Sequence, residues 1–165
     1  MRVGSLMPRL LGAGALTTLL GCGGPDYETI PTFPVRGRVQ VNGQPAEGAI
    51  VRFHPLTPQP GAEFPLTPSG RTEADGQFEL TTYEGSDGAP AGEYAITVVW
   101  PDPTWRPPGG GPPPLPPDRL KGAYADPERS RWKATVNEGN NLIDPIDIVG
   151  AELLRAGASR PASSR

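Results

Sequence analysis

The chain has 165 residues, which is enough for one domain with linkers. Its formal net charge of −3 argues against a nucleic-acid partner, because such proteins carry a clustered basic face. The 22 glycines and 23 prolines exclude long helices and favour short strands joined by turns, and the single cysteine excludes an internal disulfide.

The first 21 residues have the features of a secretory signal peptide. Arg2 and Arg9 precede a short apolar stretch over residues 10–20. A transmembrane helix needs about 20 consecutive apolar residues, so a retained membrane span is not expected here.

The end of this segment, Leu19-Leu20-Gly21-Cys22, resembles the lipobox of bacterial lipoproteins. The resemblance implies cleavage between Gly21 and Cys22 and acylation of the Cys22 thiol. The mature chain would then be a membrane-anchored lipoprotein of the cell envelope, facing the periplasm or the exterior. An ordinary secretory signal is the alternative, but it leaves Cys22 as an unpaired thiol in an oxidising compartment.

Residues 22–34 contain prolines and small polar residues, and we predict an extended tether for them. From residue 35 the pattern changes to an alternation of apolar and polar residues, which is typical of half-buried strands. The dipeptide Asn42-Gly43 predicts a tight turn, because both residues tolerate positive φ. Residues 94–100 are apolar on both faces and predict a central strand. The other expected strands are 35–41, 49–54, 71–73, 77–81, 131–136 and 142–149.

Two segments are predicted to lie outside the sheets. Residues 101–117 hold nine prolines and a run of three glycines, so we expect a disordered insert that cannot join a ladder. Residues 150–165 are small and polar, and we expect a flexible tail with at most a helical turn over 151–155.

About seven short strands without a convincing helix predict an all-β, antiparallel β-sandwich over residues 35–149. This region is similar to carboxypeptidase regulatory-like domains, which are transthyretin-like (prealbumin-like) sandwiches. The likeness is carried by the opening Val35–Val39 with Asn42–Pro45, by Thr72–Phe78, and by Pro90–Tyr94. These motifs specify turns and core positions, so they imply a fold and leave the function open.

The sequence offers no convincing catalytic or metal-binding set. His54 is the only histidine, which is too few for a copper or zinc site, and no Gly-x-Ser-x-Gly motif is present. We expect no cofactor, no metal and no enzymatic activity, and a hydrolase is the least favoured reading. The aspartates near turns (Asp75, Asp87, Asp126, Asp144 and Asp147) lack the spacing of a calcium loop and are expected to accept backbone N–H groups.

Two tryptophans offer apolar surface for a ligand. We expect Trp132 to belong to the core and assign Trp105, in the Pro-rich insert, as a possible ligand contact. The sequence therefore predicts a non-catalytic, lipid-anchored envelope module that binds another protein by strand addition at an open sheet edge. A carbohydrate- or peptidoglycan-binding module is the alternative, and nucleic acid is not an expected partner.

Overall fold

The computed structural model describes Met1 and residues 29–106 and 115–155. One sheet contains four antiparallel strands in the order β5-β4-β8-β9. β8 is paired on both sides, and Ala95 and Thr97 on its outer face are only 2% exposed. The predicted central strand is therefore confirmed. The bounds of these strands are Ile50–Pro55 for β4, Ser69–Arg71 for β5, Gly92–Val99 for β8 and Trp132–Val136 for β9.

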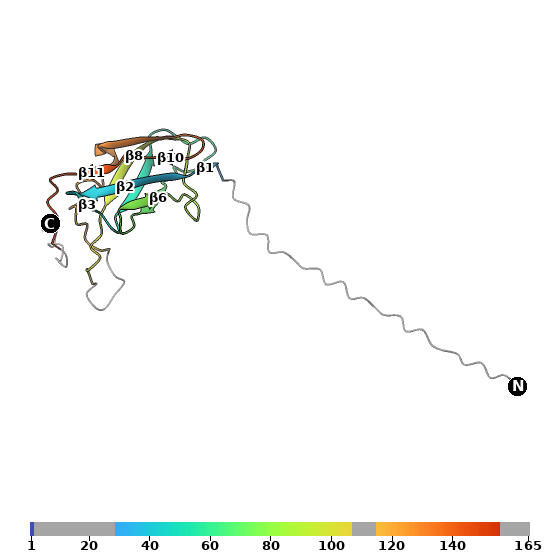
Figure 1. Cartoon of the computed structure of the whole chain (residues 1–165). Helices are drawn as coiled ribbons and strands as arrows, with labels where there is room; N and C mark the ends of the chain where they lie inside the picture. Colours follow the sequence, from blue (N-terminus) through green and yellow to red (C-terminus); the bar gives the residue numbers. More distant parts are fainter. Residues whose placement is uncertain (2–28, 107–114, 156–165) are drawn as a thin grey trace, which may run out of the picture.

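The second sheet is built around β2, Val35–Val41, which Figure 1 shows crossing in front of β8. β3 and β6 pair antiparallel with one edge of β2, while β10 and β11 run parallel to it. A separate antiparallel pair, β1 with β7, lies at the start of the domain. The bounds of these short strands are Thr32–Phe33 for β1, Gln44–Pro45 for β3, Gln77–Glu79 for β6, Ala89–Pro90 for β7, Asn141–Leu142 for β10 and Ile146–Ile148 for β11.

Side chains from both sheets meet in one apolar core. β2 contributes Val35, Val39 and Val41, which alternate with polar residues as the sequence predicts. Phe53 of β4 and Tyr94 of β8 are fully buried, with ring centroids 5.7 Å apart at a tilted angle. Burying each such side chain contributes about 1.5–3 kcal/mol, so these two rings of the four-stranded sheet add substantially to the stability of the shared core.

The predicted all-β sandwich is confirmed, with two differences in detail. The last expected strand, 142–149, is divided into β10 and β11 because Asp144 and Pro145 interrupt it. Both pieces pair parallel with β2, whereas the sequence analysis expected antiparallel pairing throughout. The turn at Asn42-Gly43 is confirmed, with φ of 51° and 78° at the two residues.

The two long sides of the sandwich differ. On one side, Ser69 of β5 and Thr81 after β6 exchange two backbone hydrogen bonds of 3.0 and 2.8 Å, so the sheets are joined there. On the other side, β9 faces the segment that carries β10 and β11, and no strand pairing connects them among the described residues. We call this second side the open side.

The tether predicted for residues 22–34 is shorter than expected. Thr32 and Phe33 pair with Pro90 and Ala89, and the N–H of Ile30 donates to the Tyr83 hydroxyl at 3.1 Å. The domain therefore already begins near residue 30. The sequence alone did not show this earlier start, because the pairing partner of Thr32 and Phe33 is β7, which is distant in sequence.

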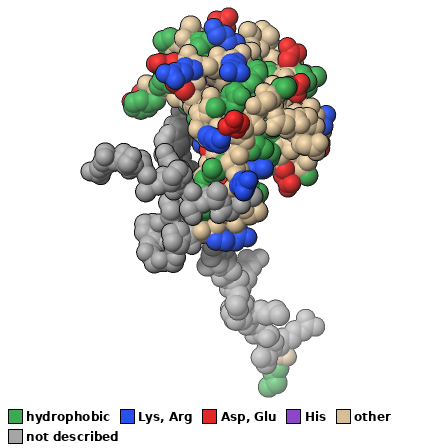
Figure 2. Space-filling view, turned by 90° about the vertical axis from the view of Figure 1, so that its left-hand side faces the viewer, with side chains coloured by type: hydrophobic (Ala, Val, Ile, Leu, Met, Phe, Trp, Pro, Cys, Tyr) green, Lys and Arg blue, Asp and Glu red, His purple; other side chains and the backbone are tan. Residues whose placement is uncertain are grey.

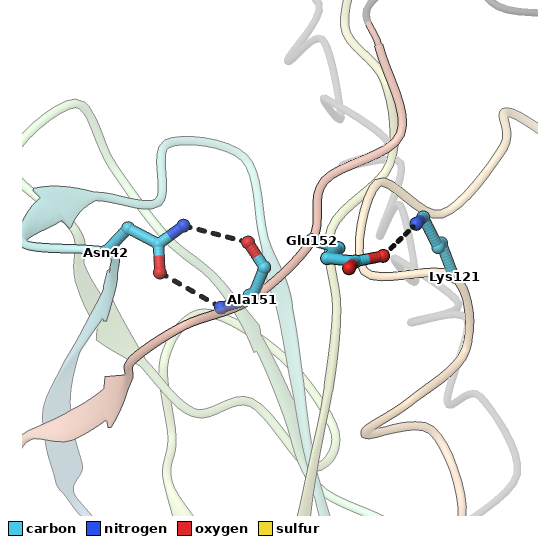
Figure 3. Close-up of polar contacts among 4 residues, drawn as sticks. All are labelled: Asn42, Lys121, Ala151 and Glu152. Carbon is cyan, nitrogen blue, oxygen red and sulfur yellow. Dashed lines mark hydrogen bonds and ion pairs between the residues drawn. The ribbon is translucent and has the colours of Figure 1, made fainter.

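The predicted flexible tail is wrong for residues 151–155. Figure 3 shows the Asn42 side-chain amide bonded to both backbone groups of Ala151, at 2.9 and 3.0 Å. Lys121 also pairs with Glu152 at 3.1 Å, and the N–H of Leu154 donates to the Arg119 carbonyl at 2.8 Å. Residues 151–155 have no regular secondary structure and form no helical turn.

The root of the insert is ordered as well. Pro101 and Asp118 form an isolated antiparallel bridge, and the N–H of Asp102 donates to the Pro117 carbonyl at 3.0 Å. The prediction of disorder is therefore wrong for the root, while residues 107–114 lie outside the described residues.

We expect Asn42→Gly to destabilise the domain by about 1–2 kcal/mol, since it keeps the positive φ but removes both bonds to Ala151. Urea denaturation gives the free energy, and hydrogen exchange reports the loss of protection at the Ala151 amide. Lys121→Ala is the control, because its ion pair is exposed and contributes less than about 1 kcal/mol. Equal effects of the two substitutions would contradict this account of the tail.

Candidate functional site

The open side of the sandwich contains a groove of about 370 Å³. Its walls are β9 on one side and residues 142–146 on the other. Trp132 is half-buried in the wall formed by β9, whereas Leu142 opposite is 85% exposed. The groove is therefore partly apolar and open to solvent, which suits an elongated ligand better than a small enclosed one.

One backbone edge of β9 is free. Glu93 of β8 accepts a hydrogen bond from the Leu56 N–H, so the odd-numbered residues of β8 direct their backbone groups toward β4. The even-numbered residues then bond β9, since the two directions alternate along an antiparallel strand. In the observed register, this directs the N–H and C=O groups of Lys133 and Thr135 to the free edge.

Charges surround the groove on both walls. Arg131 and Lys133 belong to the β9 side and are exposed, and the Arg131 guanidinium lies 5.5 Å from the centroid of the Tyr124 ring. Tyr124 in turn packs against Trp132, with centroids 5.4 Å apart. Asp144 provides an acidic group on the opposite wall. The free edge of β9 is therefore basic, and Lys133 also protects it from unspecific strand pairing.

A second hollow, of about 380 Å³, lies over the joined side of the sandwich. Glu73 and Glu79 both line it, but the Glu79 carboxylate is bonded to Arg36 at 2.7 Å. Serine and threonine hydroxyls make up much of the remaining lining. This arrangement is a solvated, polar surface without an acid–base pair or a nucleophile beside a base.

His54 has a structural environment. Its Nε2 lies 2.9 Å from the Thr97 hydroxyl on the outer face of the four-stranded sheet. Partial burial, and to a smaller extent the positive charge of Arg52, hold the pKa of His54 below its ordinary value of 6.5. Protonation of the imidazole is thus less favourable in the folded protein than in the unfolded chain, and the ring is hydrogen-bonded to Thr97 of the neighbouring strand β8.

We expect the free energy of unfolding to decrease as the pH falls below 6.5, because the unfolded chain then binds a proton that the folded His54 resists. His54→Gln keeps an amide that can bond Thr97 and should remove this part of the pH dependence. Urea titrations between pH 7.5 and 5 measure it. Asp75 is no confounder, since its pKa is lowered from 3.8, mainly by the N–H of Gln77, and titrates below this range. An unchanged slope in the variant would contradict the assignment.

The residues singled out from the sequence do not converge on one place. Cys22 and Gly21 lie outside the described residues. Trp105 is half-buried at the root of the insert, where its backbone N–H donates to the backbone carbonyl of Asp102 at 3.4 Å. It lines neither hollow. Trp132 is only partly the core residue we expected, since it packs against the core and also faces the groove.

Asp118 was missed by the sequence analysis and is the main polar anchor of the insert. Its carboxylate accepts three backbone N–H groups, from Trp100, Leu120 and Gly122, at 2.8–3.0 Å. The turn signal Leu-Lys-Gly just after it could have identified it. Asp75, Asp87 and Asp126 accept backbone N–H groups as expected.

Surface charges are mixed on the face in Figure 2, where acidic and basic side chains alternate over the described part of the domain. The residues described by the structure contain no group of three or more potential metal ligands. Within the same residues, no helix is long and apolar enough to cross a membrane.

Comparisons with protein-family models, with curated proteins and with solved structures found no match for the chain. The likeness to carboxypeptidase regulatory-like domains therefore stays a prediction.

Proposed function

We propose that this chain is a lipid-anchored module of the cell envelope that acts by binding, and that its partner is an extended segment of another envelope protein. The observation that carries the proposal is the free edge of β9 beside the groove on the open side. An added strand would complete the four-stranded sheet through backbone hydrogen bonds.

The chemistry of the groove indicates what the added strand would contain. Its inward residues would be apolar, because they meet Trp132 and Leu142. Residues of the partner that lie beside Lys133 would be acidic, because the Lys133 side chain is exposed and positively charged and its backbone faces the free edge. Backbone bonding to Thr135 would set the register, and the alternating side chains would supply the specificity.

Site-specific photocrosslinking in the native membrane tests the proposal. A benzophenone amino acid at Thr135 should give a defined protein adduct, whereas the same probe at Gln77, an exposed position on β6, should not. Adding Lys133→Pro should abolish the adduct while the domain stays folded, because the N–H that it removes faces the free edge. Absence of any protein adduct at Thr135 would overturn the proposal, and an adduct with a second copy would replace it with a homodimer.

The alternative of a glycan-binding module stays a prediction, with Trp105 as its candidate contact. A glycan-binding assay that gives the same result for the wild-type protein and for Trp105→Ala would exclude Trp105 as the contact and remove the main reason for this alternative.

A further inference from the structure

Three large hydrophobic side chains are exposed on two loops of the domain. Phe64 is 71% exposed, Leu56 45% and Tyr83 40%. We call Leu56, Phe64 and Tyr83 the proximal patch. Single exposed apolar residues are common, so the patch gains meaning from where it lies and how it is held.

The proximal patch lies at the end of the sandwich where the chain enters. The hydroxyl of Tyr83 accepts the N–H of Ile30. Gly61, in the loop between Leu56 and Phe64, is so close to Ile30 that an added Cβ would lie 2.9 Å from its side chain. Figure 1 shows β1 and these loops at one end, opposite the end marked C.

The loop that carries Phe64 is held in place by a buried side chain, Gln59. Gln59 is 8% exposed, and its side-chain amide donates to the Tyr94 hydroxyl at 3.0 Å. The side-chain oxygen of Gln59 accepts the backbone N–H of Leu66 at 2.8 Å, and its backbone carbonyl accepts the N–H of Ala62 at 3.1 Å. The buried Gln59 side chain thus fixes a loop whose largest apolar side chain, Phe64, is exposed to solvent.

The predicted anchor is close to this end. Ile30 is eight positions after Cys22 in the sequence, with seven residues between them. A flexible chain of that length has an average end-to-end distance of about 16 Å, and it spans at most about 29 Å when fully extended. The end with the proximal patch is therefore held within roughly one domain thickness of the lipid headgroups.

We propose that the proximal patch rests on the lipid surface, with Phe64 inserted into the headgroup region, and that it orients the domain so that the open side stays accessible to protein partners. This inference rests on the lipid anchor of the proposed function. Glu63 and Glu84 adjoin the patch in sequence and carry negative charge, so the surface that suits it is zwitterionic. Aromatic side chains are favoured at such an interface.

The test uses the full chain in its native membrane, with a benzophenone amino acid in place of Phe64. Irradiation should give an adduct whose mass exceeds that of the protein by one phospholipid. The matched control places the probe at Leu142, which is 85% exposed on the open side and should give no phospholipid adduct. Both positions are exposed, so neither substitution should unfold the domain.

The two proposals fail in different ways. A phospholipid adduct at position 64 and none at 142 supports the membrane contact. Protein that carries lipid at Cys22 but gives no phospholipid adduct at 64, or equal adducts at both positions, overturns the contact and leaves the anchor intact. Protein without lipid at Cys22 and without membrane association overturns both.

Discussion

Replacing Cys22 with alanine should abolish fatty-acid incorporation into the protein and release the mature domain from the membrane. The reason is that burial of acyl chains contributes about 0.8 kcal/mol per CH₂, so two chains or more hold a protein on a bilayer almost completely. The described residues contain no helix that is long and apolar enough to cross a membrane. Metabolic labelling with an alkynyl palmitate measures the first effect. Detergent-phase partitioning measures the second, in a version that carries a conventional cleavable secretory signal.

Thr18→Ala is the matched control, since it changes the proposed leader and leaves Cys22 in place. Intact mass spectrometry gives the independent check, because the wild-type protein should have the mass of residues 22–165 plus a diacylglycerol group. Palmitate label that persists in the alanine variant would contradict lipidation at Cys22. A wild-type chain with a free Cys22 thiol would refute the anchor and the membrane contact that rests on it.

Local patterns in the sequence predict the strands well because they describe burial on one face. The alternation from Val35 to Val41 is reproduced by the buried valines of β2, and Asn42-Gly43 forms its turn with positive φ at both residues. The same patterns carry no information about neighbours. Parallel pairing of β10 and β11 with β2 follows from the path of the chain around the sandwich, which alternation alone does not encode.

The candidate site was harder to predict for the same reason. The groove lies between β9 and residues 142–146, which a short turn connects. The sequence does not show that the second segment leaves β9 and pairs with β2 of the other sheet, which is what opens the groove. The ends of the domain were misjudged because their partners are distant in sequence. Asn42 holds Ala151 from 109 residues away, and Thr32 pairs with Pro90. Both ends of the domain are rich in small residues, and such a sequence resembles a linker as long as the segment that pairs with it is not known.

Gly88→Ala should destabilise the domain by about 2–5 kcal/mol, because the substitution combines a positive φ with a clash against backbone atoms. Gly88 is buried at φ 90°, and an added Cβ would lie 1.8 Å from the carbonyl oxygen of Phe33 in β1. Positive φ costs an alanine about 1–2 kcal/mol. Overpacking against rigid backbone costs about 1–3 kcal/mol more. Urea denaturation followed by tryptophan fluorescence measures the change.

Gly122→Ala separates the cost of a positive φ from the cost of the clash with backbone. Gly122 also has a positive φ, of 78°, but an added Cβ there meets nothing within 4 Å. Its cost should therefore be only the backbone term of about 1–2 kcal/mol. The clash at Gly88 involves the backbone of β1. Relative to the wild-type protein, the Gly88→Ala variant should therefore show its largest increase in hydrogen-exchange rate at Ile30 and Phe33, where the tether joins the domain. Equal destabilisation by the two substitutions would show that β1 is not packed against Gly88.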